Sequence, residues 1–242
     1  MSEEIRILKK ALKHAENLTV AKTTFLAQAA HDLKQPMQSL FVFVNSLQES
    51  DLSAEQKELV DKIEFSAENL KNLLNSLLDV SQLELGVIKA NFEVFDINNV
   101  FVQMQKEFEP LSQQKNILFK VIGENIEVFS DSVLLARMLR NLLANAFKYG
   151  ASRVLLVAKK QADDVKIIVT DNGEGINQAD LPHVFEEFYR AKNVYNIHKG
   201  SGLGLAIVKK IARVLGTHVN VKNNKNKGCC FCFNIKTAKK NP

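Results

Sequence analysis

No run of 18 apolar residues and no signal-peptide pattern occurs in the sequence, which predicts that no helix of this chain spans a membrane. Only three of the 242 residues are cysteines, and all lie in one short apolar run, at Cys229, Cys230 and Cys232. Neighbouring cysteines lack the spacing of metal ligands, so we interpret the run as a strand of small residues in a reducing compartment. These absences favour a cytoplasmic location, with membrane attachment only through a region upstream of this chain.

A dense basic surface is also lacking. The formal net charge is +5, and the lysines form small clusters spread along the chain rather than one patch interleaved with aromatic residues. This distribution argues against a nucleic-acid-binding protein. The length of 242 residues and the hydrophobic fraction of 46% are typical of a globular protein with one large or two modest domains.

The first third of the chain has the apolar spacing of two long helices. Residues 1–24 give a charged helical pattern that continues into a helix with apolar positions at Leu26, Ala30, Leu33, Met37, Leu40, Val44 and Leu47. After a turn at residues 49–53, Ser53 and Gln56 predict a capping box that begins a second helix. That helix runs to about Leu85, ends at Gly86, and has apolar positions at Val60, Ile63, Ala67, Leu70, Leu74 and Leu77.

A single hairpin of these helices cannot bury both apolar seams. A four-helix bundle made by two copies of the hairpin would bury them, so we predict a homodimer. We assign residues 1–86 to this dimerisation domain, with residues 1–20 as an incoming coiled-coil segment.

From Val87 onward the periodicity changes, and short strands alternate with helices. We expect strands at residues 92–97, 117–122, 126–129, 153–160, 165–170, 219–221 and 229–235, and helices at residues 99–114, 131–149 and 205–215. Several strands follow one another as hairpins, and a polar turn at residues 223–228 joins the last pair. The pattern predicts an α+β domain over residues 87–242.

His31 lies one position beyond the first apolar seam, at the edge of the packed face, and Asp32 follows it directly. An imidazole is a good nucleophile near neutral pH, and a neighbouring carboxylate can hold one ring N–H while the other nitrogen attacks. Pro36 removes one backbone N–H just beyond this point and is expected to bend the helix. A histidine beside an aspartate on a helix edge is more often a solvated pair. Whether His31 is instead a nucleophile therefore depends on the motifs in the rest of the chain.

Two stretches of the second domain offer polar side chains that suit a nucleotide. Asn141 and Asn145 lie four residues apart on one helix face, where amide oxygens can ligate a divalent cation, and Lys148 can face phosphate. Asp171 ends a strand and is followed by two glycines, at positions 173 and 175. A carboxylate there can accept a hydrogen bond from an exocyclic amine, and the glycines allow backbone to approach a flat ring.

A third stretch, Gly-Ser-Gly-Leu-Gly at residues 200–204, opens the last helix, where backbone N–H groups can face phosphate oxygens. It does not have the Rossmann or Walker spacing, and a lone glycine-rich turn is weak evidence. The long polar segment before it, residues 186–199, has the length of a mobile lid.

Taken together, these motifs resemble those of the sensor histidine kinases of two-component signalling, in the family's order and over about residues 15–236. Residues 25–37 resemble the H-box, 141–149 the N-box, 171–175 the G1 box, 185–190 the F-box and 200–204 the G2 box. The resemblance implies a HisKA-type dimerisation and phosphotransfer hairpin followed by a Bergerat-type (HATPase_c) ATP-binding sandwich.

The resemblance also implies a role for each matching residue. His31 would take the γ-phosphoryl group of ATP, and Asp32 would orient the imidazole and assist as a base. Asn145 would bind Mg²⁺, and Asp171 would read the adenine. The other residues implied to line the ATP site are Asn141, Lys148, Tyr149, Gly173, Gly175, Ile176, Phe185, Arg190, Gly200, Ser201, Gly202, Leu203 and Gly204.

The sequence departs from the commonest H-box at three positions. Ala30 stands where serine is common, and Lys34 replaces the usual arginine, which keeps the charge but loses the guanidinium fork. Gln35 stands where many relatives carry the threonine or asparagine that orients water in a phosphatase reaction. Its amide can do the same but is longer, so kinase activity is the firmer expectation and phosphatase activity the second.

The expected partner of the phosphorylated histidine is a response-regulator receiver domain, and no receiver pattern follows residue 236. Phe41, Phe43 and Leu73 are candidates either for its docking surface or for the core, and we favour the core. The stimulus, and attachment of the chain to a membrane-associated sensor, are left open by the sequence.

Two other functions are consistent with parts of the pattern. One is another Bergerat-fold ATPase that uses hydrolysis to close a clamp, against which the His31 hairpin argues. The other is a degenerate, non-catalytic signalling scaffold, against which the complete set of His31, Asn145, Asp171 and glycines argues.

Overall fold

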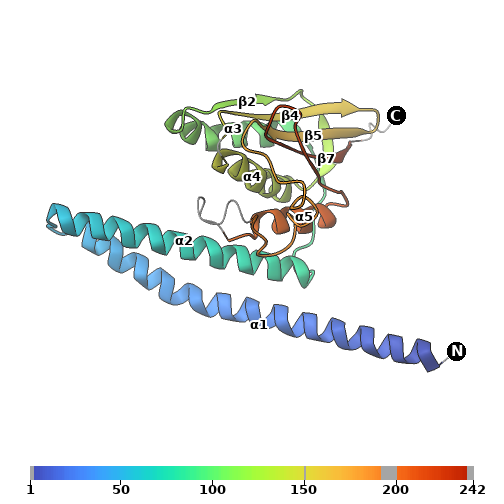
Figure 1. The fold of residues 1–242 in the computed structure, drawn as a ribbon, viewed down its shortest axis with the longest axis horizontal. Helices are drawn as coiled ribbons and strands as arrows, with labels where there is room; N and C mark the ends of the chain where they lie inside the picture. The colour runs from blue at the N-terminus through green and yellow to red at the C-terminus, as the bar shows by residue number, and fades with distance from the viewer. Residues whose placement is uncertain (1–2, 150, 192–200, 239–242) are drawn as a thin grey trace. The chain divides into compact units, whose positions relative to one another are not determined.

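The computed structural model describes residues 3–149, 151–191 and 201–238 (Figure 1). The chain divides into two compact units, Met1–Ile88 and Lys89–Pro242. The first unit is a pair of helices and the second is a sheet with helices packed on it, so each unit has its own secondary-structure class.

The first unit is a hairpin of α1, Glu3–Gln48, and α2, Ala54–Glu84. The predicted capping box is confirmed at the start of α2. The Ser53 hydroxyl accepts from the Gln56 backbone N–H at 3.3 Å, and the Gln56 side chain accepts from the Ser53 backbone N–H at 2.9 Å. Gly86 follows the C-terminal end of α2 with a φ of +65°, a left-handed conformation that favours glycine. The prediction that one helix continues through His31 is also confirmed, because α1 is unbroken and contains Pro36.

The core of the hairpin is formed by the buried side chains of Ala30, Met37, Ala67 and Leu74, with Phe41, Leu77 and Leu78 packed around them. From Leu33 onward, every second member of the first predicted seam lies outside this core. Leu33, Leu40 and Leu47 are 51%, 36% and 46% exposed, and on α2 Ile63 and Leu70 are each 46% exposed. These five side chains repeat every seven residues on their helices, and we call them the outer seam.

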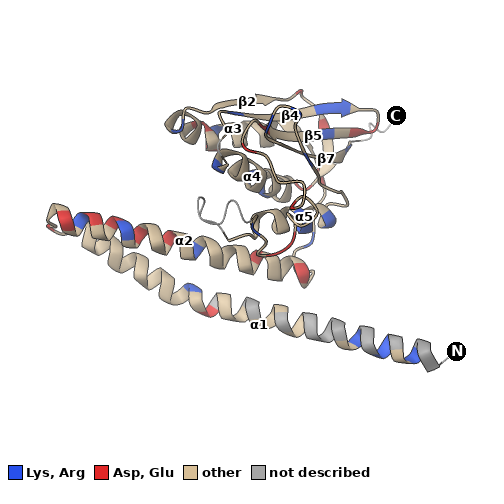
Figure 2. Ribbon diagram, in the orientation of Figure 1, with Lys and Arg blue, Asp and Glu red and all other residues tan. Residues whose placement is uncertain are grey.

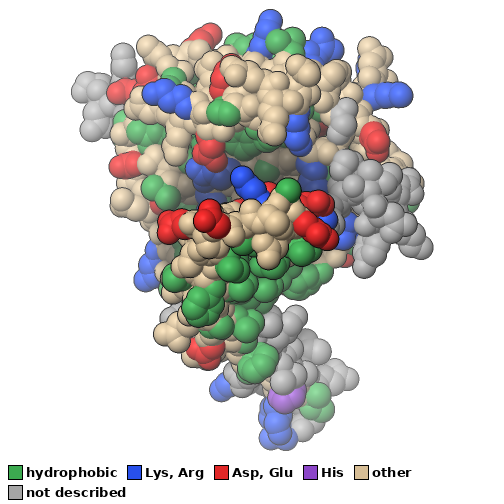
Figure 3. Space-filling view, turned by 90° about the vertical axis from the view of Figure 1, so that its left-hand side faces the viewer, with side chains coloured by type: hydrophobic (Ala, Val, Ile, Leu, Met, Phe, Trp, Pro, Cys, Tyr) green, Lys and Arg blue, Asp and Glu red, His purple; other side chains and the backbone are tan. Residues whose placement is uncertain are grey.

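Figure 3 looks onto the end of the hairpin where α1 and α2 join, and hydrophobic side chains gather on the hairpin surface there. Residues 35–48 of α1 carry no charged side chain, whereas acidic and basic side chains follow one another along α2 (Figure 2). The interpretation of Phe43 and Leu73 as core residues is wrong for the single hairpin, since they are 65% and 40% exposed. Phe41 is half-buried against the core, as expected.

The second unit contains a seven-stranded sheet within the described residues, with strand order β1-β3-β7-β5-β4-β2 and β6 beside β7. The strands are β1 Glu93–Asp96, β2 Leu118–Ile122, β3 Glu127–Ser130, β4 Arg153–Gln161, β5 Asp164–Asp171, β6 Asn220–Asn223 and β7 Cys229–Thr237. Among the described strands, β2 and β4 pair in parallel and the other pairs are antiparallel. A mainly antiparallel sheet with helices on one face is the predicted α+β arrangement.

Three helices, α3 Ile97–Gln114, α4 Ser132–Lys148 and α5 Gly204–Val214, lie along one face of this sheet (Figure 1). Alternate side chains of the central strands are buried on that face, for example Val154 and Leu156 of β4 and Ile167 and Val169 of β5. The first predicted strand is shorter than expected because the Asp96 carboxylate caps α3 by accepting from the Asn98 backbone N–H at 2.9 Å. Among the described helices, none combines the length and the apolar character needed to cross a membrane.

Candidate functional site

The H-box residues lie in the middle of α1. His31 belongs to this helix, and Asp32 and Gln35 are exposed on it. An Asp32 carboxylate oxygen accepts from the Gln28 side-chain amide at 3.0 Å, one turn earlier. Residues 31 and 35 are four apart and therefore share one face of the helix. A surface depression follows directly, lined by Gln35, Pro36, Gln38, Ser39 and Val42.

The second group of predicted site residues gathers around the C-terminal end of β5. Asp171 is the last residue of that strand, and its Oδ1 accepts from the backbone N–H of Gly173 at 2.8 Å and of Cys229 at 3.2 Å. Burial raises the pKa of the Asp171 carboxyl, and these two hydrogen bonds oppose the rise. Both of these backbone N–H groups donate to Oδ1 of the Asp171 side chain. Oδ2 is therefore the side-chain oxygen that a ligand amine could approach.

Gly173 lets the turn after β5 lie directly against the end of α4. A Cβ at this position would come within 3.0 Å of the Tyr149 carbonyl oxygen, closer than real Cβ contacts allow. The same carbonyl accepts from the Glu174 backbone N–H at 3.4 Å. The G1 and N-box stretches are therefore brought together, as the prediction of one shared site requires.

Helix α4 contributes the amides of the predicted site. Asn141 donates from Nδ2 to the Arg137 carbonyl at 2.9 Å, and a Cβ on Gly204 would lie 3.2 Å from its Oδ1. Gly204 begins α5, so this helix starts close to the Asn141 amide oxygen. Asn145 is half-buried one turn further along α4.

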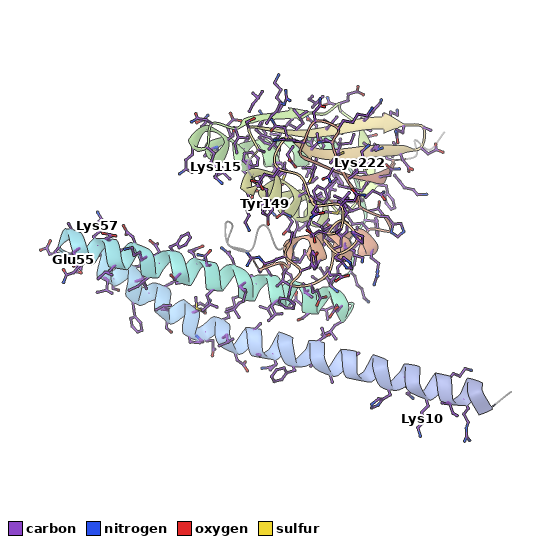
Figure 4. All side chains as sticks on the ribbon, in the orientation of Figure 1. Lys10, Glu55, Lys57, Lys115, Tyr149 and Lys222 are labelled. Atoms are coloured by element: carbon purple, nitrogen blue, oxygen red, sulfur yellow. The ribbon has the colours of Figure 1, made fainter. Side chains whose placement is uncertain are left out.

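Two cations lie near one another at the C-terminal end of α4. The pKa of Lys148 is lowered, first by burial and then by the positive charge of Arg190. The Lys148 ammonium lies 5.2 Å from the centre of the Tyr149 ring, and Tyr149 itself is labelled at the end of α4 in Figure 4. Burial also raises the pKa of Tyr149, and Arg190 acts in the opposite direction. Half-buried cations that repel one another form a place where an anion would be stabilised.

The described part of the predicted G2 box packs against the predicted F-box. Gly202 has a φ of +73°, and a Cβ there would come within 3.0 Å of the Phe188 backbone. Phe188 itself has a φ of +61°, an uncommon conformation for an aromatic residue. The Leu203 backbone N–H donates to the Ser201 hydroxyl at 3.3 Å, and the Leu203 side chain is fully buried, so only its backbone can line a ligand. Gly200 and residues 192–199 of the predicted lid lie outside the described residues.

Ile176 and Phe185 are anchored to the C-terminal hairpin of β6 and β7. The Phe185 ring meets the Phe231 ring edge to face, with the centroids 6.4 Å apart. The Ile176 backbone N–H donates to the Asn223 side-chain oxygen at 2.9 Å, and the Ile176 carbonyl accepts from the Asn223 amide at 2.5 Å. Sequence reasoning treated the 223–228 turn as a plain hairpin connection and missed this contact.

Asn172 and Asn224 were missed as well. The Asn172 side-chain oxygen accepts from the backbone N–H groups of Ser152 and Arg153 at 3.0 and 2.8 Å. The Asn224 amide donates to the carbonyl of Asp171 at 2.9 Å. The sequence does carry an Asx-Gly turn and an asparagine pair at these positions, but no sequence pattern gives their long-range partners.

The arrangement fits a nucleoside triphosphate. It combines a carboxylate with an oxygen placed to accept from an exocyclic amine, turns packed closely through glycines, and two half-buried cations. Among the described residues, no cluster of three or more His, Cys, Asp or Glu side chains could hold a metal ion. Mg²⁺ usually keeps several waters and binds through one or two protein groups together with substrate phosphates, and the half-buried Asn145 amide suits that mode.

Two family models match the chain. Residues 21–86 match the His Kinase A (phospho-acceptor) domain, and residues 130–239 match the histidine kinase-, DNA gyrase B-, and HSP90-like ATPase. Among curated proteins, the autoinducer 2 sensor kinase/phosphatase LuxQ of Vibrio parahaemolyticus is 30% identical over 236 residues, which are 93% of this chain and 28% of LuxQ. LuxQ of Vibrio harveyi is 29% identical over the same shares. The chain therefore spans about 28% of the length of these relatives.

The chain is also similar in structure to solved proteins. Full-length ShkA in complex with AMPPNP is 26% identical with a TM-score of 0.76, over 88% of this chain and 46% of ShkA. The Acinetobacter baumannii histidine kinase AdeS is 20% identical with a TM-score of 0.62, over 86% of this chain and 98% of AdeS, and shares the fold.

Proposed function

The chain belongs to the sensor histidine kinases, as their catalytic core, and we propose that it phosphorylates His31 with ATP and passes the phosphoryl group to an aspartate of a response-regulator receiver domain. The observation that carries the proposal is the cluster in the second unit where Asp171, the Gly173 turn and the end of α4 meet. A histidine on the helical hairpin supplies the acceptor that an ATPase of another kind would lack.

In the proposed reaction the adenine amine donates to Oδ2 of Asp171, and the triphosphate extends toward Lys148 and Arg190. A neutral nitrogen of the His31 imidazole attacks the γ-phosphorus, so a P–N bond forms while the bond from phosphorus to the bridging oxygen breaks. The electron pair of that bond leaves with ADP, and the second ring nitrogen of His31 holds its proton toward a carboxylate, the proposed role of Asp32.

Asn145, with the neighbouring Asn141, is the residue that would hold Mg²⁺. When bound, Mg²⁺ neutralises charge on the phosphate oxygens. The protein's own contribution is positioning: Asp171 fixes one end of the nucleotide, and the two cations attract the other. Gly202 and Gly204 support this because they let the start of α5 approach Phe188 and Asn141.

A phosphatase reaction on the regulator is the second activity that we propose. Gln35 is exposed on α1 and lies one turn after His31, beside the surface depression that it helps to line. Its amide can donate to and accept from a water molecule that attacks a phosphoaspartate. The LuxQ relatives are named kinase/phosphatase, which is consistent with both activities on one hairpin.

We also propose that two copies of the chain associate through the outer seam. Leu33, Leu40 and Leu47 on α1 and Ile63 and Leu70 on α2 leave an apolar stripe on both helices. Burying two such stripes against each other makes a four-helix bundle.

The test uses the purified chain with Mg²⁺ and γ-labelled ATP, beside His31→Gln and the matched control His14→Gln. His14 is an exposed histidine on the same helix. We expect label on the wild type and on His14→Gln, lost in acid and kept in base, and no label on His31→Gln. ATP turnover without bound label on any variant would favour the clamp-type ATPase, and absence of nucleotide binding would favour the scaffold.

A further inference from the structure

Two asparagine side chains, one at the end of β6 and one in the turn before β7, bond to the segment that contains Asp171 and Ile176. The Asn223 amide pairs with both backbone groups of Ile176, accepting from its N–H at 2.9 Å and donating to its carbonyl at 2.5 Å. This is the pair of hydrogen bonds that a neighbouring strand would make with one residue. A single side chain therefore replaces a strand partner for the loop that follows Asp171.

Asn224 makes the second connection. Its Nδ2 lies 2.9 Å from the Asp171 carbonyl, 3.0 Å from the Thr170 hydroxyl and 3.1 Å from the Cys229 carbonyl. An amide nitrogen carries two hydrogens, so at least one of them is shared between acceptors. The backbone of the adenine-reading aspartate is thus tied to the same turn.

Two glycines bring the turns into direct contact. A Cβ on Gly228 would come within 3.0 Å of the Asp171 carbonyl and of the Asn172 Cα, and a Cβ on Gly175 would lie 3.2 Å from the Asn223 side-chain oxygen. Both glycines have a φ above +80°, a region that L side chains rarely adopt. The two turns are therefore packed closely, and at Gly228 an added side chain would have to displace backbone.

From this juxtaposition we propose that Asn223 and Asn224 are positioning residues for the nucleobase, setting the distance between Asp171 and the backbone of Ile176 across the adenine pocket. The proposal rests on the proposed ATP-dependent function. Neither asparagine touches the reacting phosphate in this scheme, so their effect is on how tightly and how selectively the base is bound. Asn223 and the preceding Lys222 belong to β6, where Lys222 is labelled in Figure 4.

Asn223→Ala removes both hydrogen bonds to Ile176, and Asn223→Asp keeps the size and one acceptor but removes the donor. In the aspartate variant a carboxylate oxygen would face the Ile176 carbonyl, so we expect it to be as impaired as the alanine variant. The matched control is Asn220→Ala, which truncates an exposed asparagine at the other end of β6.

The measurements are calorimetric dissociation constants for non-hydrolysable ATP and GTP analogues, and the rate of labelling of the full chain as a function of ATP. We expect both Asn223 variants to bind the ATP analogue about tenfold more weakly. The ratio of the dissociation constant for the GTP analogue to that for the ATP analogue should become smaller. The labelling rate at saturating ATP should stay within about twofold of the wild type. The ATP concentration that gives half of the maximal labelling rate should rise about tenfold.

Affinity equal to that of the wild type in Asn223→Ala overturns the inference, and so does weaker binding with an unchanged ATP-to-GTP preference, which a merely structural role would give. A lower labelling rate at saturating ATP without a change in half-saturation overturns it as well. A wild-type chain that binds no ATP analogue overturns the proposed function itself, which separates the two failures. Asn224→Ala provides the second variant should Asn223→Ala fail to fold, because it releases the Asp171 carbonyl instead.

Discussion

Truncation of the outer seam should dissociate the proposed dimer. Leu40 and Leu70 are 36% and 46% exposed in the single hairpin, and we take these fractions as the largest share of each side chain that a second copy can bury. Leucine-to-alanine truncation removes roughly three carbons, worth about 0.8 kcal/mol each when buried, so the two substitutions together weaken the dimer by about 2 kcal/mol per chain.

Because the interface is formed by two identical surfaces, the loss is counted twice. The double variant Leu40→Ala/Leu70→Ala should therefore weaken dimerisation by about 4 kcal/mol, roughly a thousandfold in Kd. Sedimentation velocity over a dilution series measures this Kd directly. The control is Val42→Ala, which truncates a side chain that is 62% exposed on α1 and lies two positions from Leu40, off the seven-residue repeat.

Circular dichroism and binding of an ATP analogue show whether the variant hairpin and the second unit remain folded. An unchanged Kd in the double variant, with both units folded, would refute the assignment of the outer seam to a second copy. Equal weakening in Val42→Ala would refute it too, because the effect would then not follow the seam.

Two further predictions concern Asp171 and Cys229. Burial raises the pKa of the Asp171 carboxyl above its ordinary 3.8, so folding favours the protonated form. The contribution of Asp171 to stability is therefore greatest below pH 3.8 and falls as the pH rises through the folded-state pKa. Because the asparagine side chain of the variant Asp171→Asn cannot ionise, thermal denaturation at pH 7 should show the variant to be at least as stable as the wild type. Calorimetry should show that the variant loses the preference for ATP, because the asparagine NH₂ would meet the adenine amine. Burial and the charge of Asp171 raise the pKa of Cys229 to about 12, so iodoacetamide at pH 8 should alkylate the half-exposed Cys232 in the folded chain and Cys229 only in denaturant, as mass spectrometry of peptides would show. Early alkylation of Cys229, or a destabilised Asp171→Asn, would contradict these electrostatic arguments.

Local sequence rules predicted most of the element boundaries. The capping box at Ser53 and the glycine after α2 depend on neighbouring residues only, and both were found where expected. The boundary near Asp96 shows where such rules fail. Residues 92–97 alternate like a strand, but the Asp96 carboxylate accepts from a backbone N–H two residues later and begins a helix at Ile97.

The apolar seams show a second limit of sequence reasoning. All seven positions of the α1 seam have the same apolar character, so the pattern predicts packing without saying against which helix. In the structure, alternate members divide between two surfaces: Ala30, Met37 and Val44 are buried in the hairpin, and Leu33, Leu40 and Leu47 are not. Helix geometry places neighbouring seam positions at different angles around α1, and packing of the hairpin decides which of the two sets faces α2.

At the nucleotide site, the predicted residues are those whose spacing already carries a chemical meaning. The aspartate after a strand, the glycines that follow it and the paired asparagines of α4 could be identified one stretch at a time. Asn223 and Asn224 could not, because their partners Ile176 and Asp171 are 47 and 53 residues away. Polar turns with two asparagines are common between strands, and their tertiary hydrogen bonds depend on how two hairpins meet.

The two ends of the proposed nucleotide site differ in how the protein holds them. At the proposed base end, Asp171 accepts two backbone hydrogen bonds and its turn is bonded to the β6–β7 turn, so the groups proposed to read the base are held in place by the protein itself. At the phosphate end, Lys148 and Arg190 repel one another, and burial lowers the pKa of Lys148 further. A polyphosphate relieves that repulsion, whereas an uncharged nucleoside would not. If the proposed ATP site is correct, the base end should provide selectivity and the phosphate end much of the affinity. Salt should then weaken binding of ATP more than binding of adenosine.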